Sequence, residues 1–340
     1  MGCVLPAGLG QAPARQSAIG AGIPNTAGAT TINKMCGSGM RAAMIANDQL
    51  IAGSSKITIA GGIESMSNTP YVLPKVRSGL RMGHGELKDH MFLDGLEDAY
   101  EEGRLMGSYA EATAEAYQFT RQAQDEFAIR SLKRAKKANE DGSFNEEIVP
   151  VEVKHRKGSK IISQDEQPFS ADISKIPNLK PAFSKDGTVT AANSSSISDG
   201  AAALVMMSRI EAEKCNSKPL AKVVAHATNS HDPAWFTTAP IGAIKKVLDK
   251  ANWNIKDVGL FEINEAFAVV PMAAMKDLNL SPEIVNVHGG ACALGHPVGT
   301  SGARIIATLI SAMHKYDVQK GIASLCIGGG EATAIAIEKN

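Results

Sequence analysis

The sequence predicts an α/β fold made of two similar halves with a charged insertion between them. Three observations support this prediction. Strand and helix patterns alternate regularly after Ala201, a short internal repeat relates the two ends of the chain, and charge runs concentrate in residues 66–185. Alternating strands and helices are typical of layered α/β folds. The 340 residues suffice for two domains, or for one domain with a large insertion.

The first predicted elements lie in residues 1–65, which are rich in glycine and other small residues. A helix is predicted over residues 39–51, and a strand follows it at residues 56–60. The composition then changes, because residues 66–185 hold most of the runs of charged residues. This middle segment is typical of exposed helices and loops.

The last third of the chain shows the clearest alternation of strand and helix patterns. Short apolar segments rich in β-branched residues predict strands, and longer amphipathic segments predict helices. The two final strands are expected to be neighbours in the sheet. The predicted strands are residues 221–227, 258–263, 284–287, 322–327 and 332–337, and the predicted helices are residues 241–251, 265–278 and 301–315.

A weak internal repeat connects the two ends of the chain. Residues 38–41 read SGMR and residues 301–304 read SGAR. Each tetrapeptide opens a predicted helix that leads to a strand ending in two glycines, at residues 61–62 and 328–329. The shared order of glycine-rich turn, helix, strand and Gly-Gly indicates a duplicated unit.

The composition excludes several classes of protein. Lys plus Arg and Asp plus Glu balance at 35 each, so no general attraction to nucleic acid or to an anionic membrane is expected. No apolar run is long enough to span a bilayer. The five cysteines are scattered without CxxC spacing, which predicts neither a disulfide framework nor a metal site. A reducing, cytoplasmic location is therefore expected.

The first candidate for chemistry is Cys36, in the segment NKMCGSG at residues 33–39. It lies at the start of the first predicted helix, where backbone amides and the helix dipole stabilise a thiolate and lower the pKa of a thiol. The glycines on its C-terminal side let a substrate approach the backbone closely. The alternative is that Cys36 is a small buried apolar residue.

The second candidate is His296, in a glycine-rich turn at residues 288–297. Turns that join a strand to a helix are where α/β folds place active sites, and Pro297 fixes the backbone that follows. A histidine at this position could take a proton from a cysteine and return it later. The alternative is a histidine that only holds its own turn by hydrogen bonding.

Cys326 and Asn264 both end predicted strands. Cys326 precedes three glycines, whose N–H groups a ligand could reach, although a core cysteine is the simpler interpretation. Asn264 precedes a predicted helix, which it could also merely cap. Together with Cys36 and His296, they form a set of side chains suited to thioester chemistry.

At this point the segments resemble the active-site segments of the thiolase family. Residues 190–195 (TAANSS) and 198–202 (SDGAA) resemble the family's coenzyme A loop. The resemblance implies a thiolase-type five-layered αβαβα fold of two similar halves with an inserted loop domain. The four matching active-site segments are residues 33–39, 264–268, 295–297 and 326–330. The implied division is an N-terminal half of residues 1–65 and 186–216, a loop domain of residues 66–185, and a C-terminal half of residues 217–340.

The resemblance also implies roles for the candidate residues. Cys36 would be the nucleophile that carries the acyl group, and His296 would activate it and help to hold the thioester oxygen. Cys326 would remove a proton from the α-carbon of a second acetyl-CoA. Asn264, through a water, would complete one oxyanion hole, and the backbone N–H groups of Cys36 and Gly328 would form the other.

Three further residues match positions that contact the substrate in this family. Ser195 and Phe183 correspond to residues beside the pantetheine arm. Met106, in the segment LMG at residues 105–107, lies in a stretch that resembles the acyl pocket of members acting on short chains. The segment QPF at residues 167–169 lacks the arginine that some relatives use near the adenine.

The implied activity is the reversible condensation of two acetyl-CoA to acetoacetyl-CoA and CoA, in a ping-pong cycle through an acetyl-Cys36 thioester. Coenzyme A thioesters would be the substrates, with no cofactor and no metal, in a homodimer or homotetramer. The alternatives are a 3-ketoacyl-CoA thiolase of broader chain length, a condensing ketosynthase, a Cys–His hydrolase that releases acetate, and a non-catalytic CoA-binding protein. Ketosynthase relatives carry histidine or asparagine where this chain has Cys326.

The family has several dozen residues before the position that Met1 occupies here, and they supply the first strand and helix of the N-terminal half. Without that strand, we expect unpaired backbone groups, exposed apolar surface and compromised stability.

Overall fold

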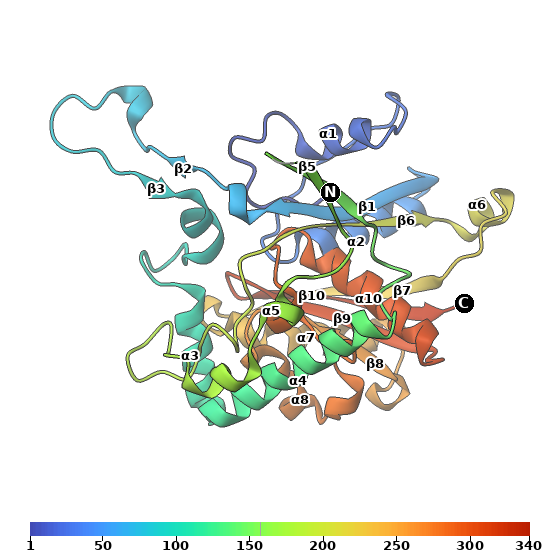
Figure 1. Ribbon diagram of the computed structural model, residues 1–340. Coiled ribbons are helices and arrows are strands. Elements are labelled where there is room, and N and C mark those ends of the chain that lie inside the picture. The colour runs from blue at the N-terminus through green and yellow to red at the C-terminus, as the bar shows by residue number, and fades with distance from the viewer. Residues whose placement is uncertain (157) are drawn as a thin grey trace.

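The computed structural model describes residues 1–156 and 158–340, and it shows helices and sheets in alternating layers (Figure 1). Helices α2 (Ser38–Ile51) and α10 (Ser301–Lys315) form the middle layer between two sheets. Beyond one sheet lies α1 (Pro13–Gly20), and beyond the other lies α7 (Ala239–Ala251). This is the five-layered αβαβα order that the family resemblance implies.

The sheet of the C-terminal part runs in the order β7-β10-β9-β8. The central strand β10 is antiparallel to both of its neighbours, whereas β8 and β9 are parallel. Both faces of this sheet are covered by helices, and its central strands are almost entirely apolar, as buried strands are. The bounds are β7 Ala221–Ser230, β8 Leu260–Ile263, β9 Lys320–Ile327 and β10 Glu331–Lys339.

The internal repeat has a structural cause in the middle layer. A side-chain carbon on Gly39 of α2 would lie 2.8 Å from the N atom of Ala303. A side-chain carbon on Gly302 of α10 would overlap the backbone N atom of Met40. The two repeated Ser-Gly pairs therefore mark the crossing point of the two helices, where only glycine lets the backbones approach so closely.

The other sheet joins segments from either side of the charged insertion. Strand β1 (Ile57–Ser65) pairs antiparallel with β6 (Asp199–Met207) along its whole length. Gly2 adds parallel bridges to Ile32 and to Gly62. The pairing supports the proposed division of the chain, in which the sequence before the insertion and the sequence after it form one half.

Two helices dominate the insertion, which otherwise consists of short hairpins and loops. Helix α3 (Met106–Tyr117) and helix α4 (Arg121–Glu140) lie against the C-terminal part, as the closeness of α3 to α8 (Val269–Leu278) and of α4 to α9 (Ala291–Leu294) shows. A hairpin projects from the body in Figure 1. The remaining elements are β2 Tyr71–Val72 and β3 Lys88–Asp89 of that hairpin, β4 Val151–His155, β5 Gly158–Ile162, α5 Gln167–Ser170 and α6 Arg209–Lys214.

Two predicted elements differ from the structure. The segment at residues 284–287 forms only a single parallel bridge, between Val285 and Phe261, because the side chain of Asn286 then bonds both backbone groups of Ile263, at 2.8 Å each, where a strand would place its own backbone. The helix predicted from residue 265 begins only at Val269. The preceding residues pair instead with the loop at residues 193–195, through a hydrogen bond from Ser195 N to Ala266 O of 3.0 Å.

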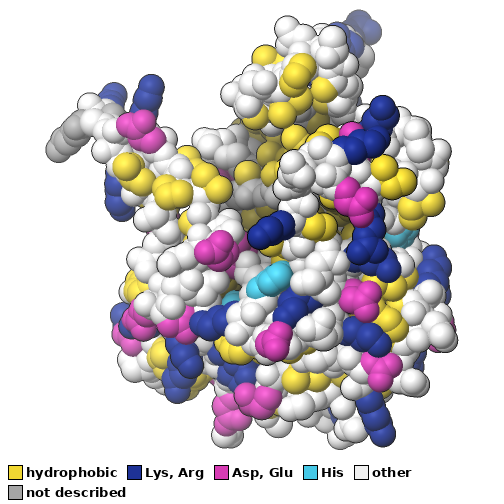
Figure 2. All heavy atoms as spheres, turned by 90° about the vertical axis from the view of Figure 1, so that its right-hand side faces the viewer, with side chains coloured by type: hydrophobic (Ala, Val, Ile, Leu, Met, Phe, Trp, Pro, Cys, Tyr) yellow, Lys and Arg dark blue, Asp and Glu magenta, His cyan; other side chains and the backbone are white. Residues whose placement is uncertain are grey.

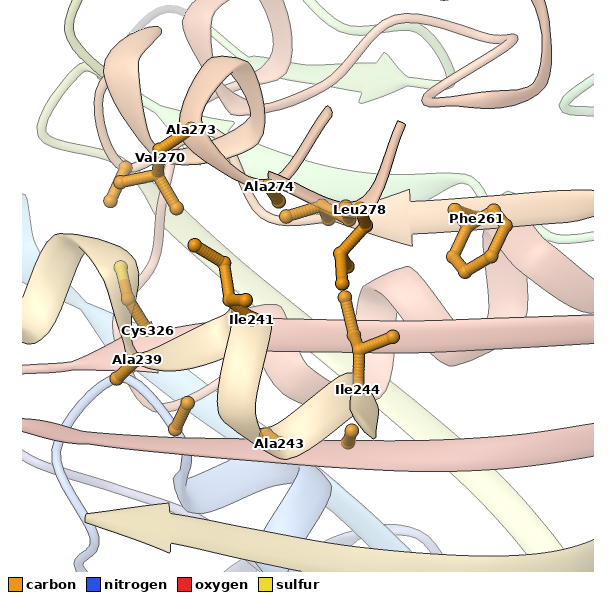
Figure 3. Packing of buried hydrophobic residues seen from close by; sticks show 14 of the residues in the cluster. Ala239, Ile241, Ala243, Ile244, Phe261, Val270, Ala273, Ala274, Leu278 and Cys326 are labelled. Carbon is orange, nitrogen blue, oxygen red and sulfur yellow. The ribbon is translucent and has the colours of Figure 1, made fainter. Parts of the chain in front are cut away.

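The largest apolar cluster lies between the β7-β10-β9-β8 sheet and its outer helices. Figure 3 shows Ile241 and Ile244 of α7 pointing toward Val270 and Leu278 of α8. Cys326 of β9 belongs to the same cluster. Burying such side chains stabilises the fold by roughly 1.5–3 kcal/mol each. The core therefore reaches the end of the strand that carries a candidate catalytic residue.

The surface carries charges of both signs. Figure 2 shows basic and acidic side chains interspersed on one face of the molecule, in keeping with the balance of charges in the sequence. Within the described residues, no helix is both long enough and apolar enough to cross a membrane.

Candidate active site

Cys36 lies in a tight turn that leads into α2. The N-cap of the helix is Gly37, and Met35 before the cysteine has a left-handed φ of 48°. A side-chain carbon on Gly37 would overlap Ile327 Cδ1 and lie 2.9 Å from its Cγ1. Glycine is therefore required for this turn to pack against the residue that follows Cys326. The contact brings the two cysteine-bearing turns, one from each half, together.

The surroundings of the Cys36 thiol oppose ionisation. Burial raises the pKa of Cys36 to about 11. Hydrogen bonds to the sulfur from the backbone N–H groups of Gly328 and of Cys36 itself lower the pKa, but by less than burial raises it. The charge of Glu64 raises the pKa further. The expectation that the helix N-terminus lowers this pKa was wrong, because the loss of hydration outweighs the helix amides. Cys36 keeps some solvent contact yet has protein on most sides, and its resting form is the thiol.

His296 is buried and neutral. Burial, and secondarily the charge of Arg304, lower the pKa of His296 to about 3. The Nδ1 atom of His296 lies 2.5 Å from Ser301 Oγ, which is the shortest contact of the ring. Gly295 has a φ of 86°, and a side chain there would overlap Ser198 Oγ, so glycine is needed to hold the histidine turn in place.

Asn264 faces His296 from the end of β8. Its Nδ2 atom lies 3.4 Å from Nδ1 and 3.5 Å from Nε2 of the histidine. Its Oδ1 atom is buried and has no hydrogen-bond partner among the described residues. The alternative in which Asn264 caps a helix was wrong, because α8 begins at Val269 with Ala268 as its N-cap. A buried, unpaired amide oxygen is a place where a water or a substrate group would be stabilised.

Cys326 is fully buried near the end of β9. Burial raises the pKa of Cys326 well above its usual range, and the neighbouring Cys36 raises it further. Strand β9 runs beside the segment of Asn264, since Asn264 N donates to the O atom of Ser324, two residues before the cysteine, at 3.0 Å. The burial of Cys326 fits either a structural residue of the core or a catalytic residue. Only a catalytic role gives a reason for its closeness to Cys36.

Each of the three residues expected beside the substrate lies against one of the active-site segments. Phe183 packs edge-to-face against Phe267 with ring centroids 6.0 Å apart. A side-chain carbon on Gly328 would lie 3.3 Å from Met106 Sδ. Ser195 is linked by its N–H to the segment that carries Asn264. The structure thus pairs Asn264 with His296 and the Cys36 turn with the end of the Cys326 strand, and it links the other candidates to the segments that carry these residues.

Sequence reasoning missed the two serines that fasten the catalytic turns. Ser301 Oγ contacts His296 and donates to Pro297 O at 3.0 Å. Its counterpart in the repeat, Ser38, accepts from Lys34 N at 2.8 Å and donates to Met35 O at 2.7 Å. The signal was present in the repeated tetrapeptide, whose serine has the same place in both halves.

Gln167 was also missed as a bridge between loops. Its side chain donates to Cys292 O at 2.7 Å and accepts from Ser196 Oγ at 2.6 Å. It therefore ties the loop at residues 190–196 to the histidine turn. In the part of the chain that the structure describes, no group of three or more His, Cys, Asp or Glu side chains could hold a metal ion.

Comparison with known proteins gives consistent matches over the whole chain. A family model described as the N-terminal domain of thiolase matches residues 1–210, and one described as the C-terminal domain of thiolase matches residues 217–339. The chain is 47% identical over 341 residues to an acetyl-CoA acetyltransferase of Allochromatium vinosum, covering 100% of this chain and 86% of that protein.

Two solved structures have the same architecture. The acetyl-CoA acetyltransferase of Bacillus anthracis superposes with a TM-score of 0.96 at 42% identity. A thiolase from Ascaris suum, solved in complex with coenzyme A, gives a TM-score of 0.93 at 44% identity. Each match covers 100% of this chain and 86% of the other.

Proposed function

The chain belongs to the thiolase family, and from that premise we propose that it is an acetyl-CoA C-acetyltransferase. It condenses two acetyl-CoA molecules to acetoacetyl-CoA and CoA, and it catalyses the reverse cleavage. The observation that carries the proposal is the meeting of the Cys36 turn with the Cys326 strand end through Gly37 and Ile327, beside the buried pair of Asn264 and His296. Relatives that bear this activity's name share the whole length of the chain.

In the first half-reaction, the Cys36 sulfur attacks the carbonyl carbon of acetyl-CoA. His296 is neutral at rest and accepts the thiol proton, so no free thiolate has to persist in the buried site. The carbon–sulfur bond to CoA breaks, and Cys326 gives its proton to the departing thiolate. An acetyl-Cys36 thioester remains, with a protonated His296 opposite an ionised Cys326. The attraction between these two opposite charges offsets the cost of desolvation that otherwise disfavours both ions.

In the second half-reaction, the Cys326 thiolate removes a proton from the methyl carbon of a second acetyl-CoA. The resulting enolate carbon attacks the acetyl group on Cys36, which forms the carbon–carbon bond of acetoacetyl-CoA and releases the Cys36 sulfur. That sulfur takes back the proton from His296. Atoms and charges then balance, and both cysteines are thiols again.

Two sets of donors stabilise the oxygens that become negative. A water on Asn264 together with His296 serves one oxygen, and the N–H groups of Cys36 and Gly328 serve the other. Both N–H groups already point at the Cys36 sulfur, which supports their convergence at the reacting carbon. The loss of one such donor typically costs a factor of about 10²–10³ in turnover.

Coenzyme A reaches the site past Ser195 and Phe183, with Met106 against the acyl group. Met106 lies close to Gly328, which leaves little depth behind the reacting carbonyl and favours a short acyl chain. The substrates are themselves the coenzyme A thioesters, and the reaction needs no metal or other cofactor. A relative that binds coenzyme A supports this choice of substrate.

A homodimer or homotetramer in the cytoplasm is part of the proposal. Each of the five cysteines is a free thiol, as is usual in a reducing compartment. The projecting β2–β3 hairpin carries exposed apolar side chains, among them Leu73, Leu80 and Met82, of which the last is 99% exposed. Such side chains on a projecting hairpin are typical of a contact between subunits.

The test is thiolysis with several substrates. Acetoacetyl-CoA and CoA are mixed with the protein, and acetyl-CoA formation is compared with cleavage of 3-ketohexanoyl-CoA and 3-ketooctanoyl-CoA. We expect clear preference for acetoacetyl-CoA. Equal or faster cleavage of the longer chains would instead assign a broad 3-ketoacyl-CoA thiolase. Binding of CoA without turnover would indicate a non-catalytic protein, and release of acetate from acetyl-CoA would indicate a hydrolase.

A further inference from the structure

The turn that carries the nucleophile is strained. Met35 is not glycine, yet its φ of 48° lies in the left-handed region. A residue held in that region costs on the order of 1–3 kcal/mol and persists only where its surroundings enforce it. Within the turn, Asn33 Oδ1 accepts from Met35 N at 2.9 Å, and Ser38 Oγ bonds Lys34 N and Met35 O. These local bonds hold the shape of the turn but not its place relative to the other half.

One ion pair links this turn to the glycine turn of the opposite half. Lys34 Nζ lies 2.6 Å from Glu331 Oε2, although 297 positions separate the two residues. Glu331 is itself fixed, because Ser230 Oγ donates to its other oxygen at 3.1 Å and its backbone pairs with Ile327. The side chains of Lys34 and Glu331 are 23% and 32% exposed, so the pair is partly shielded from water.

The glycine turn is held at Gly330 by a hydrogen bond from His231 N of 2.8 Å, and the ion pair adds a link to the other half. Gly329 and Gly330 have φ values of 91° and 85°, and three consecutive glycines impose little stiffness of their own. On one side the turn continues strand β9, and on the other it meets Glu331. The ion pair therefore joins the turn that carries the Gly328 N–H to the strained turn that carries the Cys36 N–H.

We propose that Lys34 and Glu331 are positioning residues, whose ion pair sets the spacing of the Cys36 and Gly328 N–H groups in the oxyanion hole. This inference rests on the proposed function, because it concerns the same reaction. A partly exposed ion pair contributes little to stability. A shift of the two donors by a fraction of an ångström nevertheless weakens bonds that act only in the transition state. Catalysis should therefore depend on the pair much more than folding does.

The first test compares Lys34→Met and Glu331→Gln with the wild-type protein. We expect the rate of acetylation by acetyl-CoA to fall about 10- to 100-fold in each variant. The midpoint of thermal unfolding and the dissociation constant of CoA should stay unchanged. The matched control is Lys315→Met, which breaks the Lys315–Asp141 pair of similar exposure, 33% and 34%, and leaves the acetylation rate unchanged.

The second test restores the pair in reverse. In the double variant Lys34→Glu/Glu331→Lys, the fall in the logarithm of the acetylation rate should be at most half of the fall seen in each single variant. Hydrogen exchange provides a readout that does not depend on activity, since peptides over residues 33–38 and 327–331 should exchange faster in Lys34→Met.

The outcomes separate the two proposals. Faster exchange in both peptides with a wild-type protein that is never acetylated would refute the proposed activity, and the positioning role with it, while showing that the ion pair still holds the two turns together. An unchanged acetylation rate in Lys34→Met, or exchange that does not change in either turn, would overturn the positioning role and leave the activity standing. A rate loss that only follows a lower unfolding midpoint would overturn it as well.

Discussion

His296 Nδ1 and Ser301 Oγ lie 2.5 Å apart, and the same hydroxyl oxygen lies 3.0 Å from Pro297 O. A serine hydroxyl has one proton to donate. If that proton goes to Pro297 O, the oxygen accepts the Nδ1 proton of His296, which leaves Nε2 with its lone pair. Ser301 thereby selects the tautomer in which His296 can act as a base toward Cys36, in the way that an oriented acceptor fixes the tautomer in other histidine sites.

Ser301→Ala should slow acetylation by acetyl-CoA about 10- to 100-fold, because the histidine loses its preferred tautomer and orientation. Ser301→Thr keeps the hydroxyl and should retain more activity. The release of CoA in a rapid-mixing experiment measures the rate. Thr308→Val is the control, since it removes another buried hydroxyl from the same helix. Equal rates for wild type and Ser301→Ala would show that the contact has no role in proton transfer.

The Cys36 thiol should show a high apparent pKa in solution. With the pKa of Cys36 raised to about 11, the reactive thiolate fraction increases about tenfold per pH unit between pH 7 and pH 10. The inactivation rate with iodoacetamide, measured without substrate, should rise with that slope. A plateau below pH 8 would contradict this expectation and would reveal a resting ion pair between Cys36 and His296.

Gly37→Ala tests the contact that joins the two cysteine turns. The added methyl group would overlap Ile327, so the free energy of unfolding should fall by about 1–3 kcal/mol. Ile327→Ala removes the obstructing atoms and also costs stability through the cavity that it leaves. The two losses should be markedly less than additive in the double variant, as chemical denaturation can measure. Strict additivity would mean that the two residues do not press on each other.

His288 should make the fold sensitive to acid. Its ring lies between Phe144 and Tyr316, and neither ring nitrogen has a hydrogen-bond partner in the described part of the chain. Burial lowers the pKa of His288 to about 4 from 6.5. The folded state then binds fewer protons than the unfolded state, so stability is complete above pH 6.5 and falls as the pH drops toward 4.

His288→Phe removes that dependence and keeps an aromatic ring between its neighbours. Between pH 7.5 and pH 5, the free energy of unfolding of the wild-type protein should fall by about 2 kcal/mol more than that of His288→Phe. Urea unfolding at the two pH values measures the difference. The prediction fails if wild type and His288→Phe lose the same free energy on acidification.

Local patterns in the sequence predicted the alternation of strands and helices, and the family resemblance predicted the layered fold and the candidate catalytic residues, but neither pointed to Ser301 or Gln167. The helix at residues 301–315 was predicted with its observed bounds, since its apolar spacing and its Ser-Gly start are both local. The strand predicted at residues 284–287 is reduced to one bridge at Val285 for a non-local reason, because the side chain of Asn286 takes the place of further backbone pairing. Local propensity contains no information about such a substitution.

The chemistry of Cys36 shows the same limit. The start of a helix can be predicted from sequence, but the burial that raises the pKa of Cys36 depends on apolar residues that are remote along the chain, such as Met66 and Val298. The Lys34–Glu331 pair is equally remote along the chain. Ser301 is different, because its place in the repeat was visible and only its hydrogen bond to His296 required the structure.

The central claim is that Cys36 carries an acetyl group between two half-reactions. The most direct measurement is the intact mass of the protein after incubation with acetyl-CoA, followed by peptide mapping, with Cys36→Ala as the control. We predict a gain of one acetyl group on Cys36 in the wild-type protein, its removal on addition of CoA, and no gain in Cys36→Ala. No acetylation of the wild type, or acetylation that persists in Cys36→Ala, would contradict the account.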